Sequence, residues 1–209
     1  IQEKKYDVLV IGAGAAGMRA AIAASDEGAS VCLVSKSLLG KAHTVMAEGG
    51  AAAALGNADE RDNWKVHFRD TIKGGKHLNN WKMAKIHAEQ APERILELER
   101  WGAVFDRTKD GKINQRNFGG HRYPRLAHVG DRTGLEIIRT VQDKVIHQDN
   151  IDIFMECTVA TIITEDNQAV GALAYYRNNG EIVAIHAKAI VVATGGIGKA
   201  YRVTSNSWE

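Results

Sequence analysis

The segment that most constrains the fold is a glycine-rich turn between two apolar runs near the start of the chain. Residues 6 to 12 read YDVLVIG, a continuous apolar run that is typical of a strand buried on both faces of a parallel sheet. GAGAAG begins at Gly12, and the alanine-rich segment after it predicts a helix ending near Gly28. Residues 30 to 35, SVCLVS, predict a second buried strand. This order of strand, glycine turn, helix and strand predicts an α/β fold with a parallel sheet.

The spacing of Gly12, Gly14 and Gly17 is that of a dinucleotide-binding turn. The first glycine permits the tight turn, the second lets the backbone approach a pyrophosphate, and the third brings helix and strand close together. The helix N-terminus then offers N–H groups and a partial positive charge to phosphates. A glycine turn that serves only the backbone is the alternative, and the strand-to-helix context favours the dinucleotide.

The end of the second predicted strand narrows the choice of dinucleotide. An acidic residue usually stands there to bind the adenosine ribose, whereas this chain has Ser35 and Lys36. Ser35 can still hydrogen-bond a ribose hydroxyl, and Lys36 is a cation. NAD is therefore disfavoured, and NADP or an FAD variant remains.

A second glycine signal lies near the other end, where KAIVVATGGIGKAY, residues 188 to 201, runs from an apolar strand into Thr194, Gly195 and Gly196. One interpretation is a strand that simply ends in a turn. The other is that the chain returns to the same nucleotide, because paired glycine turns far apart in sequence are more typical of FAD-binding folds. We therefore expect the two glycine segments to converge on one site.

The residues between these signals predict helices followed by strands. Residues 81 to 90 and 92 to 101 predict two helices, with Pro92 in the first turn of the second. Residues 151 to 186 predict strands, with a hairpin at the Asn-Asn-Gly sequence of positions 178 to 180. A further helix is predicted at 133 to 148, and its apolar stripe comprises Leu135, Ile138 and Val145.

Composition excludes several classes of function. The 209 residues carry a net charge of +2 without a basic block, which disfavours a nucleic-acid-binding face. The histidines lack metal-ligand spacing, so we expect no metal site.

Cys32 and Cys157 lie in separate apolar runs and are predicted to be buried thiols in a reducing compartment. No signal peptide precedes the first strand and no apolar run approaches roughly 20 residues, so we expect a soluble chain whose link to a membrane is a partner.

The loop SKSLLGKAHTVMAEGG, residues 35 to 50, places His43 among small residues. Together with GAGAAGMRAA, QRNFGGHRYPRLAHVGDRTG and VVATGGIGKAYRVTSN, it resembles the flavoprotein subunit of succinate dehydrogenase and fumarate reductase, most closely the branch found in actinobacteria and other bacteria. The resemblance runs over the whole chain in the family's order. It implies a Rossmann-like FAD-binding domain over residues 1 to 209, with a glutathione-reductase-type parallel sheet and a β-rich insert. The fold would be incomplete at its C-terminus, and the capping domain absent.

The resemblance also implies a covalent bond between His43 and the 8α carbon of FAD. An ordinary loop histidine is the alternative, and related aspartate oxidases lack a histidine here. A neutral imidazole can attack an electrophilic flavin, and Lys41, where many relatives carry arginine, supplies positive charge. The implied FAD-binding set is Gly12, Ala13, Gly14, Ala15, Ala16, Gly17, Ser35, Lys36, Lys41, Ala42, His43, Thr44, Glu48, Gly49, Gly50, Cys157, Thr158, Val159, Thr194, Gly195 and Gly196.

For the substrate, the resemblance places Phe118 over a dicarboxylate and the Gly50 backbone beside it. Core packing of a buried aromatic is the alternative for Phe118. Glu48 stands where the family has glutamine or glutamate, and it would either tune proton movement or cap a glycine turn. The family's proton-transferring arginine is expected beyond Glu209, so no catalytic residue is assigned within the chain, and we expect these 209 residues alone to be inactive.

The implied activity is hydride transfer between succinate or fumarate and covalent FAD, with electrons passing to an iron–sulfur subunit. Membrane anchor subunits with a quinone would place the protein at the cytoplasmic face of a bacterial inner membrane. Fumarate reduction as the physiological direction, or a non-catalytic flavin-binding module, are the alternatives. No nucleic-acid partner is expected.

Overall fold

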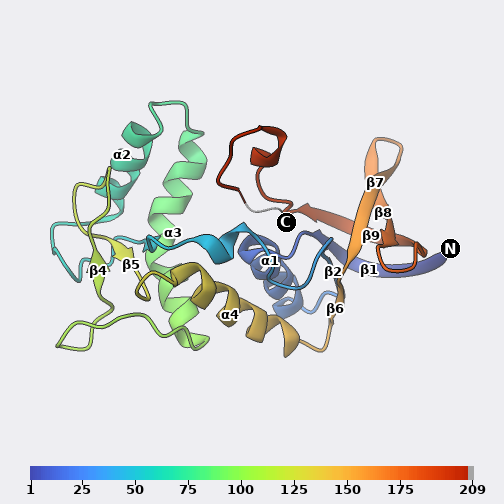
Figure 1. Ribbon diagram of the computed structural model, residues 1–209, viewed down its shortest axis with the longest axis horizontal. Coiled ribbons are helices and arrows are strands. Elements are labelled where there is room, and N and C mark those ends of the chain that lie inside the picture. Colours follow the sequence, from blue (N-terminus) through green and yellow to red (C-terminus); the bar gives the residue numbers. More distant parts are fainter. Residues whose placement is uncertain (207–209) are drawn as a thin grey trace. The chain divides into compact units, whose positions relative to one another are not determined.

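A six-stranded sheet with the order β6-β2-β1-β9-β8-β7 is the framework of the first part of the molecule (Figure 1). At its centre, β1 (Gln2–Ile11) pairs in parallel with β2 (Val31–Val34) on one side and with β9 (Ile182–Val192) on the other. β6 (Ile151–Phe154) continues the parallel part beyond β2. The computed structural model describes residues 1–206, and residues 207–209 lie outside this described part.

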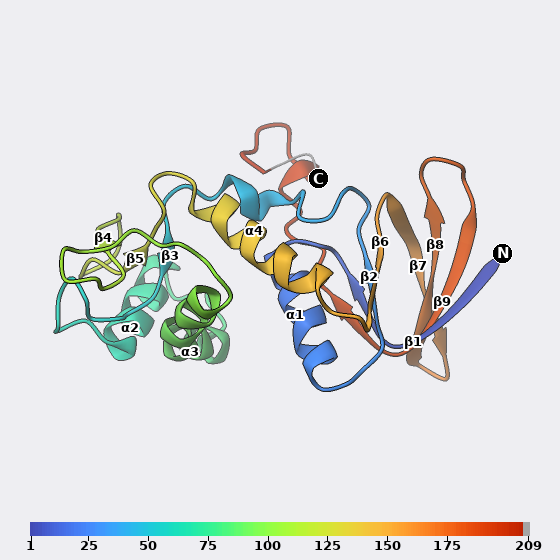
Figure 2. The same ribbon diagram turned by 90° about the horizontal axis from the view of Figure 1, so that it is seen from below.

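The helix α1 (Ala15–Asp26) follows the glycine turn and packs against β1 and β2 (Figure 2). Its buried side includes Met18 and Ile22, so an apolar stripe attaches the helix to the sheet. The helix ends before Gly28, whose φ of +82° is one that glycine adopts without strain. The predicted order of strand, glycine turn, helix and strand, and with it the α/β fold class, is confirmed.

The β-rich insert extends the same sheet. β7 (Cys157–Glu165) and β8 (Gln168–Tyr176) are antiparallel, and β8 pairs in turn with β9, so the three strands form a meander. The predicted hairpin joins β8 to β9, with Gly180 at a φ of +73°. Both cysteines are free and buried, as predicted, and burial raises the pKa of the Cys157 thiol to about 11.

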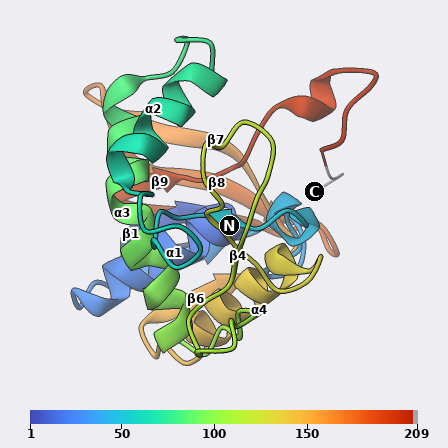
Figure 3. The ribbon, with the colours of Figure 1, turned by 90° about the vertical axis from the view of Figure 1, so that its left-hand side faces the viewer.

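The chain divides into two compact units, and the sheet belongs to the first, formed by residues 1–46 and the chain from residue 141 onward. The second unit, residues 47–140, contains a pair of helices, α2 (Trp64–Gly74) and α3 (Trp81–Arg100), which lie side by side (Figure 3). Asn63 and Asn80 cap them, each accepting hydrogen bonds from two first-turn N–H groups.

A small antiparallel sheet completes the second unit. Its central strand, β5 (Leu126–Ala127), pairs with β3 (Ala51–Ala52) and with β4 (Gln115–Arg116). Beside it lies a small core in which Ile95 and Phe105 are almost fully buried. The two strands that flank β5 come from the segment after His43 and from the segment just before Phe118, and they are more than 60 residues apart in the sequence.

Two sequence-based predictions about helices are wrong in detail. α3 is one continuous helix with Pro92 inside it, where two helices were predicted. Proline fixes a φ that a helix accepts and forfeits one hydrogen bond, and buried residues on both sides, Ala88 and Ile95, hold the helix in one piece.

The helix α4 (Thr133–Ile146) is found where it was predicted, but its buried stripe differs. Ile138 and Val145 are buried as expected, whereas Leu135 is 49% exposed and Val141 takes its place. At about 100° per residue, Leu135 lies roughly 90° from the centre of the buried stripe. No helix in residues 1–206 combines the length and the apolar character needed to cross a membrane.

Candidate nucleotide-binding site

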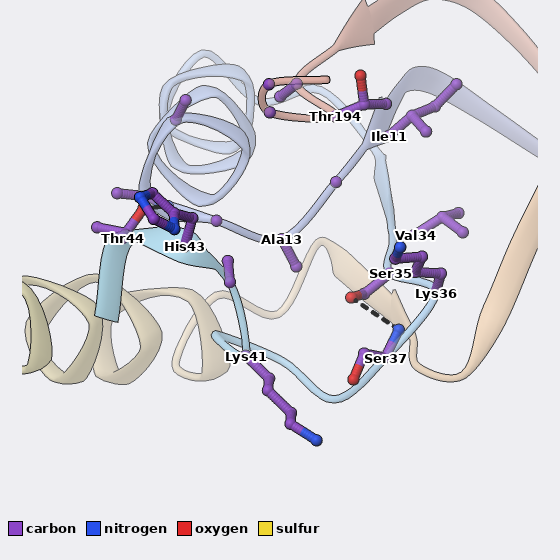
Figure 4. A pocket seen from close by; sticks show the side chains of 18 of the residues that line it. Ile11, Ala13, Val34, Ser35, Lys36, Ser37, Lys41, His43, Thr44 and Thr194 are labelled. Carbon is purple, nitrogen blue, oxygen red and sulfur yellow. Dashed lines mark hydrogen bonds between the residues drawn. The ribbon is translucent and has the colours of Figure 1, made fainter. Parts of the chain in front are cut away.

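A pocket of about 490 Å³ opens where β1, β2 and β9 end and α1 begins (Figure 4). All of its lining residues belong to the first unit. The carboxyl ends of neighbouring parallel strands meet at one edge of a sheet, which is the usual place for a ligand in such folds. The pocket gathers residues from five segments of the chain, namely 11–16, 34–37, 41–44, 157–159 and 193–196, together with Lys199 and Asn206.

Gly12 brings the two glycine segments into contact. Its φ is +110°, and a Cβ at this position would lie 2.3 Å from the carbonyl oxygen of Ala193, so a side chain is excluded. The Gly12 N–H donates to the Val34 carbonyl at 2.8 Å, and the Ala193 N–H donates to the Ile11 carbonyl at 2.8 Å. The predicted convergence of Gly12 and Gly14 with Thr194–Gly196 is therefore observed.

The third glycine of the turn serves packing. A Cβ at Gly17 would lie 1.7 Å from the Gly12 carbonyl oxygen, so glycine is needed for helix and strand to approach this closely. Gly17 does not line the pocket, unlike Ala15 and Ala16 before it. Gly14 caps α1 without a side-chain hydrogen bond, so the first turn presents backbone N–H groups and the positive end of the helix dipole.

The end of β2 forms one wall of the pocket. Ser35 is buried, and its Oγ accepts a hydrogen bond of 3.4 Å from the Ser37 N–H, drawn as a dashed line in Figure 4. Its carbonyl accepts a bond of 2.9 Å from the Cys157 N–H, which brings the start of β7 into the pocket wall. Lys36 is exposed, so its ammonium group lies in contact with solvent beside this wall.

The His43 loop lies against the glycine turn. Residues His43–Met46 form a short 3₁₀ turn, and the Ala15 N–H at the start of α1 donates to Thr44 Oγ1 at 3.4 Å. A Cβ on Gly14 would lie 3.3 Å from Ala42 Cβ, so small residues on both segments permit this approach. His43 lines the pocket with an exposed side chain, and Figure 4 shows its ring beside Thr44, with Lys41 extending in another direction.

The site can hold an extended anionic ligand. Three lysines line it, Lys36, Lys41 and Lys199, and the helix N-terminus adds a partial positive charge. The pocket-lining residues of the turn and the first helical turn, 12–16, carry no side chain larger than a methyl group, so a pyrophosphate can approach their backbone and they fit a dinucleotide such as FAD. Sequence reasoning missed Ile11, Val34, Ser37, Ala193, Lys199 and Asn206. Four of these flank predicted residues, whereas nothing in the sequence indicated Lys199 or Asn206.

The remaining predicted residues lie in the second unit. Gly50 has a φ of +117°, and a Cβ there would lie 2.9 Å from both the Ala127 carbonyl oxygen and Leu126 Cβ. The Phe118 ring lies against Gly49, 3.4 Å from the position that a Cβ would take. Phe118 is 57% exposed, so core packing does not account for it here.

Comparison with known proteins identifies the class of this fold and site. Residues 7–208 match the family described as FAD binding domain, and the chain belongs to that family. Within it, the chain is similar to flavoprotein subunits of succinate dehydrogenase and fumarate reductase, as its motifs indicate.

Three relatives illustrate this similarity. The Mycobacterium smegmatis Sdh1 structure in complex with UQ1 is 56% identical, with a TM-score of 0.95 over 100% of this chain and 37% of that chain. A fumarate reductase (CoM/CoB) polypeptide of Methanothermobacter marburgensis is 42% identical over 97% of this chain and 37% of its own length. The succinate dehydrogenase flavoprotein subunit of Rickettsia conorii is 38% identical over 94% of this chain and 34% of its own length. The chain thus spans little more than a third of these relatives.

Proposed function

We propose that this chain is the FAD-binding part of a succinate:quinone oxidoreductase flavoprotein, which transfers hydride between succinate or fumarate and covalently bound FAD. The observation that carries this proposal is a single pocket containing both glycine segments, the end of β2 and the His43 loop. Similarity to named succinate dehydrogenase and fumarate reductase flavoproteins supports it. When bound, FAD supplies the two-electron acceptor or donor for the dicarboxylate.

Different residues of the pocket bind different parts of the cofactor. The glycine turn and the first turn of α1 bind the pyrophosphate through backbone N–H groups. Ser35 and Lys36 bind the adenosine ribose, and the backbone of Cys157–Val159 lies at the adenine side. Thr194–Gly196 closes the pocket from the end of β9.

His43 forms the covalent tether to the 8α carbon of the flavin. Support comes from its exposed ring at the pocket wall and from Thr44, which fixes the loop to the N-terminus of α1. To form that bond, a neutral imidazole nitrogen would replace one hydrogen of the 8α methyl group. The proton would pass to solvent, and the two electrons left on the flavin would be taken up by fumarate or by the proposed iron–sulfur subunit. Lys41 contributes positive charge on the same loop.

The residues of this chain that contact the substrate in this proposal belong to the second unit. Gly50 and Phe118 contact the dicarboxylate, Glu48 lies beside it, and the proton-transferring arginine comes from outside these residues. Electrons pass to an iron–sulfur subunit, and anchor subunits with a quinone hold the complex at the cytoplasmic face of the bacterial inner membrane. The quinone sets the direction of the reaction, and similarity to a named fumarate reductase flavoprotein subunit favours fumarate reduction as the second candidate.

Replacing His43 with serine in the intact enzyme tests the tether. FAD should stay bound, because its noncovalent contacts are spread over many residues, but it should be released on denaturation in acid. Attachment at the 8α carbon makes the ring electron-poor and raises its potential, and ~30 mV is worth about 1.4 kcal/mol for a two-electron couple. Succinate oxidation should therefore fall strongly, and fumarate reduction should fall less.

The matched control is His147→Ser, which changes an exposed histidine outside the pocket. Its flavin should remain attached in acid, and its rates should equal those of the wild type. Wild-type flavin that comes away freely in acid, or a His43→Ser enzyme that oxidises succinate at the wild-type rate, would contradict the covalent tether.

A further inference from the structure

Arg116 binds the loop that carries Glu48 and Gly49. Its Nε donates to the Gly49 carbonyl at 2.8 Å, and its Nη2 donates to the Glu48 carbonyl at 2.5 Å. Its Nη1 donates to Asp131 at 3.0 Å. One planar guanidinium therefore holds two consecutive peptide carbonyls of a segment that precedes β3 and has no strand partner of its own.

These two bonds also determine where the loop's N–H groups point. The Glu48 carbonyl and the Gly49 N–H belong to one peptide unit, and the Gly49 carbonyl and the Gly50 N–H belong to the next. Both units are trans, so within each the C=O and N–H point in opposite directions. Because both carbonyl oxygens accept hydrogen bonds from Arg116, the N–H groups of Gly49 and Gly50 are directed away from the guanidinium.

Two further contacts hold the same glycines. The Phe118 ring lies 3.4 Å from the position of a Cβ on Gly49, and β5 lies within 2.9 Å of the position of a Cβ on Gly50. Phe118 follows Arg116 by two residues, so one short segment supplies both the guanidinium and the ring. The loop is therefore fixed on its carbonyl side and at both α-carbons.

Consecutive backbone N–H groups on one side of a fixed loop are suited to a carboxylate. Building on the proposed function, we infer that Arg116 is a positioning residue, which holds the N–H groups of Gly49 and Gly50 in place for a substrate carboxylate beside Phe118. Arg116 acts through the loop. Lysine would preserve its charge but has no planar fork to hold two carbonyls at once.

The test uses the full flavoprotein in its complex, with Arg116→Lys and Arg116→Gln. Malonate, a dicarboxylate that cannot be oxidised, is the probe, and its dissociation constant is followed by the flavin absorbance. Losing the fixed N–H donors should weaken malonate binding by about ten- to a hundredfold in both variants, because each bond to a charged group is worth about 1.5–3 kcal/mol. KM for succinate should rise by a similar factor, while flavin content and attachment stay unchanged.

The matched control is Asp131→Asn, which removes only the negative charge of the third, exposed partner of Arg116. The Asp131 side chain is 80% exposed, and its loss should change malonate affinity by less than about threefold. Wild-type malonate affinity in Arg116→Lys would overturn the inference, and so would equal weakening in Asp131→Asn. Loss of flavin from both Arg116 variants would also overturn it, since Arg116 would then maintain the fold. A wild-type enzyme that binds no malonate would instead contradict the proposed function.

Discussion

The two units of the chain differ in what they bury. In the first, the core beneath the pocket is apolar, with Leu9, Cys32 and Ile185 fully buried among other strand residues. In the second, Arg125 is fully buried together with the carboxylate of Asp62. The first unit thus depends on non-directional burial and on close backbone approach, whereas the second also depends on a few directional ionic bonds.

The ionic cluster of the second unit is tightly bonded. Arg125 donates from Nε and Nη2 to the two oxygens of Asp62 at 3.1 and 2.9 Å, and from Nη2 to Asp70 at 2.9 Å. Asp70 also accepts the backbone N–H of Arg122 at 2.9 Å, which ties the segment after Phe118 to α2. His67, 1% exposed, lies beside this cluster. A cluster of this kind fixes one arrangement, and it is costly to break by removing a single partner.

The largest effect is expected from Arg125→Met, which leaves two carboxylates without their cation. Removing one partner of a buried pair costs about 3–5 kcal/mol. The free energy of unfolding, measured with urea, should fall by this amount, and hydrogen exchange should rise first in residues 47–140. The control is Arg61→Met, which removes a 75% exposed partner of Asp59 and should therefore lower the free energy of unfolding far less. Equal effects of the two substitutions would show that burial of the Arg125 cluster adds nothing to the stability of the second unit.

A smaller effect is expected in the first unit from Gly12→Ala. The substitution forces a φ of +110° on alanine and places its Cβ 2.3 Å from the Ala193 carbonyl oxygen, so the two glycine segments must separate. We expect the free energy of unfolding to fall by about 2–4 kcal/mol, of which roughly 1–2 kcal/mol is backbone strain, and the flavin content per chain to fall as well.

Gly28→Ala separates the backbone strain from the steric clash with Ala193 in that loss of stability. Gly28 also has a positive φ, +82°, but nothing lies within 4 Å of its Cβ position. Its substitution should cost only the backbone strain and should leave FAD binding unchanged. Equal losses from Gly12→Ala and Gly28→Ala would show that close approach at the turn is unimportant.

The difference between the two units also determines how much of each could be predicted from the sequence. The strand, glycine turn and helix of the first unit are specified locally, because Gly12, Gly14 and Gly17 have a spacing with one structural meaning. The sequence also predicted that Thr194–Gly196 would meet the first glycine turn, because this second glycine segment comes directly after an apolar strand. Lys199 could not be placed in the pocket, because it lies in an irregular segment whose path depends on tertiary contacts.

The second unit was less predictable. Pro92 was assigned to a helix start, because local rules disfavour proline within helices, but packing of the residues around it outweighs that preference. Arg125 and His67 gave no local sign of burial, because charged residues are normally exposed unless distant partners meet them. Contacts among Asp62, Asp70 and Arg125 span at least 55 residues, so only the folded structure reveals them.

The smallest effect that we expect is a pH dependence of the stability of the second unit, caused by His67. Burial lowers the pKa of His67 to about 4, and interactions with Arg125, His87 and His121 act in the same direction, while Asp70 opposes them. The pKa in the unfolded chain is about 6.5. Below pH 6.5 the unfolded chain therefore binds a proton that the folded unit does not, so stability present above this pH is lost as the pH falls toward 4.

Between pH 6.5 and 4.5 this loss should be on the order of 2 kcal/mol, since one pKa unit corresponds to about 1.4 kcal/mol. The measurement compares urea unfolding of the wild type and of His67→Gln across this range. His121, whose pKa burial also lowers, and Asp62, whose pKa burial raises, remain in both proteins, so their contributions cancel in the difference. The variant should be less stable than the wild type at pH 7, and the gap should narrow as the pH falls. A constant gap would show that His67 has the same pKa in the folded and in the unfolded chain. The contrast between an apolar first unit and a charge-dependent second unit would then rest on Arg125 alone.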